Sequence, residues 1–171
     1  TRYGALVLKG EGVPQNTEFA LRYMNKGCDA GDLEGCLVLA DAYANGTGVS
    51  RDVVLSKRLA SQTCEAGFGQ GCYVLAQLGE AETTWGQESS LDATALYTQS
   101  CELGYGQGCA EIALRAYSNG NAGPEIQKQM DVGCVGGDVR ACLALGGLYK
   151  GDSNRAFPYW DSACTFGNLS G

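Results

Sequence analysis

Nine cysteines carry most of the potential chemistry of this sequence, and eight of them form four couples with one spacing. The two members of each couple lie eight residues apart: Cys28 and Cys36, Cys64 and Cys72, Cys101 and Cys109, Cys134 and Cys142. A zinc site usually has cysteines about two to four residues apart, so this spacing does not fit one. Inert thiols are the alternative, but four such couples in an acidic chain favour disulfides, which form in an oxidising compartment such as the periplasm or the cell exterior.

Other chemistry-bearing patterns are absent from the sequence. No histidine is present, which excludes a histidine-based triad, a histidine general base and a histidine-ligated metal. The motifs Ser-x-x-Lys, Lys-Thr-Gly, Gly-x-Ser-x-Gly and Gly-x4-Gly-Lys do not occur either. The carboxylate pair Glu80 and Glu82 falls in an expected loop, where solvation is a better account than acid–base catalysis. We therefore expect no catalytic residues, no metal and no cofactor.

Charge and hydropathy narrow the choice of partners. The 171 residues include 12 Lys and Arg against 19 Asp and Glu, a net charge of −7. A surface of this sign disfavours nucleic-acid phosphates. No run of about 18 apolar residues occurs, so we expect no membrane span. A protein with a basic or mixed apolar surface is the partner that this composition favours.

The couples recur at intervals of 33 to 37 residues, and Cys164 follows 30 residues after Cys134, which indicates stacked repeats. A glycine three residues after each first cysteine can end one helix, and the second cysteine then falls in the first turn of the next helix. Helical stretches such as 36–44 and 51–66 alternate between couples, and no segment has the pattern of a strand. We expect one all-α domain, residues 1–171, of about four to five helix pairs, cut within a repeat at both ends. The partner of Cys164 is expected to lie beyond the chain end.

Three local features depart from the regular repeat or bear on its core. The copy that begins at Cys72 is expected to have a long loop at 79–86, and Trp85 in this loop is a candidate binding residue. The alternative is that Trp85 folds back to cover the lost turn. Pro158 should be tolerated if its helix starts near Ala156, and should kink a helix that starts at Asp152. Tyrosines are expected in the core at positions 43, 97 and 149.

The residues Leu39-Ala40, Tyr43 and Gly46-x-Gly48-Val49, with the alanine-rich second helix, resemble the Sel-one-like repeat, a relative of the tetratricopeptide repeat. The cysteine couples resemble its cysteine-rich branch, best known from the Helicobacter cysteine-rich proteins. The resemblance implies a right-handed α/α solenoid with one disulfide per repeat, export from the cytoplasm, and a concave face that binds partners. Members of the family include adaptors, secreted proteins, proposed weak penicillin-hydrolysing proteins and immunity proteins that neutralise antibacterial effectors.

On that architecture, the first helix of each pair should line the concave face. Residues one, two and five positions after the second cysteine should then reach the groove or its rim. The resulting candidate partner-binding residues, with Trp85 added, are Leu37, Val38, Asp41, Tyr73, Val74, Gln77, Trp85, Glu111 and Leu114. The alternative is that they are only partly buried sides of helices.

The leading functional hypothesis is an exported, disulfide-stapled interaction scaffold. Its most concrete form, by analogy with the family, is a periplasmic immunity protein that binds a secreted antibacterial effector. A weak penicillin-binding or β-lactamase-like protein and a secreted host-interaction factor are the alternatives. The sequence offers no residue to which penicillin hydrolysis could be assigned.

Overall fold

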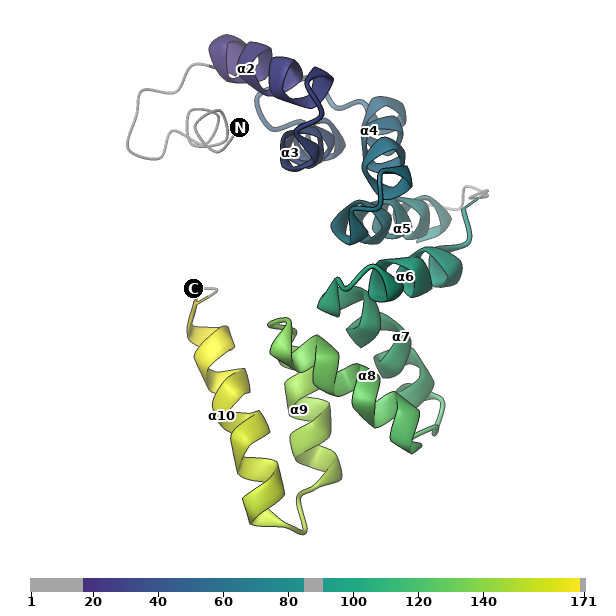
Figure 1. The fold of residues 1–171 in the computed structure, drawn as a ribbon, viewed down its shortest axis with the longest axis vertical. Coiled ribbons are helices and arrows are strands. Elements are labelled where there is room, and N and C mark those ends of the chain that lie inside the picture. Colours follow the sequence, from purple (N-terminus) through teal and green to yellow (C-terminus); the bar gives the residue numbers. More distant parts are fainter. Residues whose placement is uncertain (1–16, 85–90, 170–171) are drawn as a thin grey trace. The chain divides into compact units, whose positions relative to one another are not determined.

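The computed structural model describes residues 17–84 and 91–169, and it describes side chains for 19–81 and 91–167. Every regular element in these ranges is an α-helix, which confirms the all-α fold class (Figure 1). Within each unit, short connections join successive helices in the pattern that the cysteine period predicts. The chain divides into two compact units, residues 1–91 and 92–171. That the two units belong to a single domain stays a prediction.

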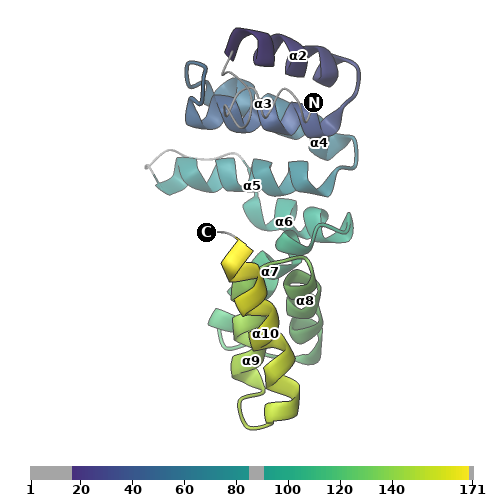
Figure 2. The same ribbon diagram turned by 90° about the vertical axis from the view of Figure 1, so that its left-hand side faces the viewer.

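The first unit is a stack of helices around small aliphatic side chains. It contains α2 (Thr17–Asp29), α3 (Leu33–Asn45), α4 (Val53–Glu65) and α5 (Gly69–Thr84). Each helix packs against the next, and Figure 2 shows α2, α3 and α5 in successive layers. The core between α2 and α3 is formed by Met24, Leu39 and two alanines, all at most 1% exposed. Alanine at these positions lets the helix backbones approach closely.

The second unit repeats this plan with a larger core. It contains α6 (Ala93–Glu102), α7 (Gly106–Ser118), α8 (Pro124–Val135), α9 (Val139–Leu148) and α10 (Ser153–Leu169). Met130 and Leu145 are buried at its centre, and the helices α7 and α9 also touch each other. Of the tyrosines expected in the core, Tyr97 is buried, whereas those at 43 and 149 are half-buried at its edge.

Each repeat is joined to the next by a tight turn and a disulfide. At the first joint, Gly31 has a φ of +89°, a left-handed conformation that ends α2 and that glycine adopts without strain. Asp32 then caps α3 by accepting a hydrogen bond from the backbone N–H of Gly35 at 3.1 Å. The predicted disulfides are confirmed at all four couples, with Cα–Cα distances of 4.5–4.7 Å, between Cys28 and Cys36, Cys64 and Cys72, Cys101 and Cys109, and Cys134 and Cys142.

The residue directly before the second cysteine decides how closely the two helices approach. A Cβ added at Gly71 would overlap the hydroxyl of Thr63 and lie 2.7 Å from the backbone nitrogen of Cys64. A Cβ at Gly108 would lie 2.6 Å from the Ser100 hydroxyl. Both contacts are closer than real Cβ atoms make, so glycine is required there. The two helices therefore approach closely at both of these joints.

One expectation about helix limits is wrong, and one open choice is decided. The loop expected from Gly79 to Gly86 begins later, because α5 continues to Thr84 and places Glu80 and Glu82 within a helix. The residues that follow Gly79 are rich in Glu and Ala, which have a high helix propensity. This propensity outweighs the low helix propensity of the glycines at positions 79 and 86. Of the two starts considered for the last helix, the structure favours the earlier one, because α10 begins at Ser153 and Pro158 is its sixth residue.

Candidate partner-binding surfaces

On α3, only part of the predicted surface is accessible. Leu37 is 6% exposed, so it contributes to helix packing and offers almost no area to a partner. Val38 is half-buried against the core of the first unit. Asp41 is exposed, and its carboxylate accepts a hydrogen bond of 2.8 Å from the side-chain amide of Asn45 one turn later. Of the predicted residues on α3, the accessible one is thus the carboxylate of Asp41, beside the amide of Asn45.

On α5, the predicted residues form one contiguous polar and aromatic strip. Tyr73 and Val74 are half-buried, and Gln77 is exposed. The Gln77 amide donates a hydrogen bond of 3.2 Å to the Tyr73 hydroxyl, which holds both groups on the same face of the helix. Glu80 continues this face one turn further. Trp85, the remaining candidate of this repeat, lies outside the described residues.

In the second unit, Glu111 of α7 is committed to an ion-pair cluster. Its carboxylate is 15% exposed and accepts a hydrogen bond of 2.6 Å from the guanidinium of Arg140 on α9. The same guanidinium reaches Asp138 at 2.7 Å, and Arg115 lies 3.7 Å from Glu111. Leu114, the other candidate on α7, packs against the core. This cluster ties α7 to the start of α9.

In that cluster, the carboxylates of Glu111 and Asp138 offset the positive charge of Arg140. The hydrogen bond to Asp138 is the main cause that raises the pKa of Arg140 above its ordinary value, and Glu111 adds to it. Asp138 also caps α9, accepting from the backbone N–H of Ala141 at 3.1 Å. Sequence reasoning missed both arginines. Arg115 stands four residues after Glu111, a helical spacing that the sequence itself contains, whereas Arg140 is matched to Glu111 only once the register of α7 and α9 is known.

A second cluster lies where α8, α9 and α10 meet. The ring of Tyr149 stacks on that of Tyr159 at 5.9 Å between centroids, and the Arg155 guanidinium lies 3.9 Å from the Tyr149 centroid. The Tyr149 hydroxyl donates to the side-chain oxygen of Gln127 at 2.8 Å. Burial raises the pKa of Tyr159, and the nearby carboxylate of Asp131 raises it further. These contacts hold α8, α9 and α10 together, and most of the polar groups in the cluster interact with one another.

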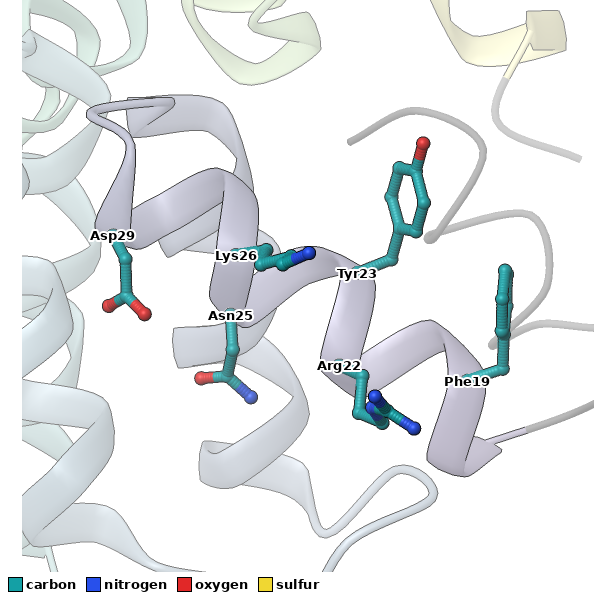
Figure 3. Close-up of a pocket in the computed structure, with 6 residues that line it drawn as sticks. All are labelled: Phe19, Arg22, Tyr23, Asn25, Lys26 and Asp29. Atoms are coloured by element: carbon teal, nitrogen blue, oxygen red, sulfur yellow. The ribbon is translucent and has the colours of Figure 1, made fainter.

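A hollow of about 490 Å³ lies along α2 (Figure 3). Its lining combines two aromatic rings with two cations: Phe19, Arg22, Tyr23, Asn25, Lys26 and Asp29. Tyr23 stands five residues before Cys28, as Leu59 stands five residues before Cys64, and Leu59 packs against the core formed with α2 and α3. Because the equivalent position in α4 serves helix packing, we assign no ligand to the hollow.

Within the described ranges, no group of three or more Asp, Glu or Cys side chains could hold a metal ion. No described helix is long and apolar enough to cross a membrane. The predicted site residues that are both described and accessible therefore lie on α3 and α5 of the first unit and at the α7–α9 cluster of the second. These residues offer a partner side-chain contacts and charged groups.

The comparisons with known proteins agree on the repeat family. Residues 1–32 and 33–68 match the Sel1 repeat, the family that the Sel-one-like pattern indicated. Among curated protein sequences, no match is found.

Solved structures extend the likeness over the remainder of the chain. A Sel1 repeat protein from Oxalobacter formigenes is 26% identical, with a TM-score of 0.77 over 99% of this chain and 72% of its own. A protective antigen of uropathogenic Escherichia coli is also 26% identical, with a TM-score of 0.72 over 96% of this chain and 37% of its own.

An immunity protein from Pseudomonas aeruginosa has the same fold at 18% identity, with a TM-score of 0.66 over 88% of this chain and 59% of its own. Sel1 repeats generally mediate contacts between proteins, and disulfides of this number are typical of an oxidising, exported environment. Residues 1–68 match the Sel1 repeat, the chain has the fold of solved Sel1-repeat proteins, and its four disulfides, about one per repeat, fit the cysteine-rich branch of that family.

Proposed function

We propose that this protein is an exported interaction scaffold that binds a basic or mixed apolar partner protein through the first helices of its repeats. The observation that carries the proposal is the covalent clamp at each repeat joint. Disulfides with Cα–Cα distances of 4.5–4.7 Å fix each second helix to the next first helix. A rigid surface loses less conformational entropy on binding, which favours affinity.

The accessible part of the surface favours a cationic partner. Asp41 on α3 is exposed, and α5 adds Gln77 and the half-buried ring of Tyr73. An aromatic ring beside polar and acidic groups can supply an anchor and charge steering at the same time. Trp85 stays a candidate anchor of the same surface.

The most concrete form of the proposal is a periplasmic immunity protein that neutralises a secreted antibacterial effector by binding it. The fold is compatible with that role, since an immunity protein from Pseudomonas aeruginosa shares it. At 18% identity the likeness supports the architecture only, so the choice of an effector as partner rests on the family analogy.

Affinity capture from the native organism at moderate salt tests the scaffold function. The bait is the oxidised protein, and Asp41→Lys is the first variant. The matched control is Glu65→Lys, which makes the same change in net charge at an exposed position at the end of α4. We expect the wild-type protein and the control to retain a basic protein that Asp41→Lys loses or retains at least about tenfold less strongly.

Two outcomes would contradict the proposal. Recovery of no protein by the oxidised bait would oppose the scaffold function itself. Equal loss with Asp41→Lys and Glu65→Lys would show that net charge, and not the α3 surface, controls binding. The immunity role is tested separately: co-production of the scaffold with the captured protein should restore growth of a bacterium that the captured protein alone inhibits.

A further inference from the structure

Another hollow, of about 310 Å³, lies in the first unit beside α4 and α5. Its lining combines two cations and a hydroxyl of α4 with two leucines: Lys57, Arg58, Ser61, Leu75 and Leu91. Leu75, on α5, is only 6% exposed, whereas Arg58 is exposed and Lys57 is half-buried. A cavity of this size is large enough for a small organic group. The hollow therefore offers one ligand both an apolar part and a cationic part.

The repeat equivalence identifies what occupies the corresponding place in the second unit. Lys57 and Gln127 both stand seven residues before the first cysteine of a couple. Gly79 and Tyr149 both stand seven residues after a second cysteine. In the second unit, the Tyr149 hydroxyl donates a hydrogen bond of 2.8 Å to the side-chain oxygen of Gln127. In the first unit, glycine replaces that tyrosine, so α5 supplies no ring from this position.

The side chains that line the hollow are also more positive than their counterparts. Lys57 replaces the neutral Gln127. Ser61 replaces Asp131, whose carboxylate lies beside Tyr159 in the second unit. Gln127 accepts a hydrogen bond from a phenol hydroxyl, whereas the ammonium group of Lys57 can only donate. A group that takes the place of the phenol must therefore present an acceptor oxygen, and an anionic oxygen is the strongest acceptor.

Two cations are placed to attract such an oxygen. Arg58 follows Lys57 directly and forms no ion pair within the residues that the structure describes. The Ser61 hydroxyl already donates a hydrogen bond of 2.8 Å to a carboxylate oxygen of Glu65. Ser61 therefore offers a ligand no donor, and the attraction comes from Lys57 and Arg58.

We propose that this hollow binds an aromatic ring that carries an anionic oxygen group, as in an aryl phosphate, sulfate or carboxylate. The ring packs against Leu75 and Leu91, and the anionic oxygens face Lys57 and Arg58. Two sources have this chemistry: a free aryl acid, and a tyrosine side chain that is phosphorylated or sulfated on its oxygen. The cations belong to α4, a second helix of the repeat, so this inference does not depend on the function proposed for the first helices.

Phenyl phosphate provides the first probe, because it consists of one ring and one anionic group. Titration into the whole oxidised chain, followed by NMR of the backbone amides, measures its dissociation constant. We expect it to bind at least about tenfold more tightly than inorganic phosphate, which lacks the ring, and than phenol, which lacks the charge. The largest changes in chemical shift should occur at residues 57–61, at Leu75 and at Leu91.

Variants separate the cationic part of the site from the part that takes the ring. Arg58→Gln should weaken the binding of phenyl phosphate by at least about threefold, and the double variant with Lys57→Gln by at least about tenfold. Lys128→Gln is the matched control, because Lys128 is the exposed counterpart of Arg58 in the second unit, and it should leave the affinity unchanged. Gly79→Tyr restores the ring of the second unit and should abolish binding. If that variant does not fold, since Gly79 is buried, the double variant and the control still decide the question.

Either of two results overturns the proposal. Equal affinity for phenyl phosphate and inorganic phosphate would show that the ring contributes nothing. Equal affinity of the unchanged protein and the double variant would show that the anion binds elsewhere. A peptide with one phosphotyrosine between glycines distinguishes the two sources. Tighter binding than that of phenyl phosphate indicates a modified tyrosine of a partner protein, and equal or weaker binding indicates a free aryl acid.

Discussion

The two units are built from the same repeat and the same disulfide, but they fill the joints between helices differently. At the α4–α5 joint, Thr63 occupies the space that Gly71 leaves, and its hydroxyl donates a hydrogen bond of 2.8 Å to the Ala60 carbonyl. At the α6–α7 joint, Ser100 faces Gly108, and its buried hydroxyl has no hydrogen-bond partner in the part of the chain that the structure describes. Both joints thus have the same disulfide, whereas the hydrogen bonding of the polar residue beside it differs between them.

The second unit also joins its repeats by charge. Arg140 connects α9 to Glu111 of α7, and Arg115 lies over the ring of Tyr97 at 4.7 Å from its centroid. Such contacts are typically worth less than a disulfide, because exposed ends of long side chains are screened by water. The disulfide therefore sets the architecture of a joint, while the side chains around it adjust its stability.

The largest effect is expected from removal of a disulfide. Replacement of Cys64 and Cys72 by serine opens a loop of about nine residues, and chain entropy predicts a loss of about 2–3 kcal/mol in the free energy of unfolding. The same change at Cys134 and Cys142 should cost as much within error, if the disulfide dominates both units. Urea denaturation monitored by circular dichroism measures both losses. A loss below about 1 kcal/mol in the second unit would show that its ion pairs replace the disulfide.

A somewhat smaller effect is expected from a methyl group at the tightest joint. Gly71→Ala forces a Cβ into Thr63 and the Cys64 backbone, and such overpacking costs about 1–3 kcal/mol. Gly147→Ala on α9 is the control, because a Cβ there meets nothing within 4 Å. That variant should gain about 0.5–1 kcal/mol from helix propensity. Equal effects of the two substitutions, by thermal unfolding, would refute the role of close approach at the joint.

The next effect tests whether charge strengthens the second unit. Glu111→Gln removes the carboxylate that Arg140 and Arg115 share, and we expect a loss of about 1 kcal/mol because both cations remain partly solvated. The loss should shrink as salt rises. Glu102→Gln, at an exposed position on α6, should change stability by less than about 0.5 kcal/mol. A salt-independent loss at Glu111 would indicate packing instead of charge.

The sequence predicts the fold well because the cysteine spacing is a geometric constraint. A couple eight residues apart with a glycine between its members permits few arrangements other than two helices and a tight turn. The surface is harder to predict from the sequence, since exposure depends on neighbours from other repeats. Leu37 and Leu143 occupy equivalent positions, yet one is 6% and the other 53% exposed. Periodicity cannot distinguish them, because the difference lies in what covers each helix.

The smallest effect comes from the two buried serines and bears directly on the polar part of the joints. Ser100→Ala replaces a buried hydroxyl without a partner by hydrogen, so stability should stay the same or rise by less than about 1 kcal/mol. Ser56→Ala in the first unit removes a buried hydroxyl that donates to the Ala40 carbonyl at 2.7 Å, and it should cost about 1 kcal/mol. The two substitutions remove the same atom from equally buried positions, so their difference in urea midpoint isolates the hydrogen bond. If Ser100→Ala were the more damaging of the two, the hydroxyl of Ser100 would have to be satisfied in solution, and the contrast between the joints of the two units would not hold.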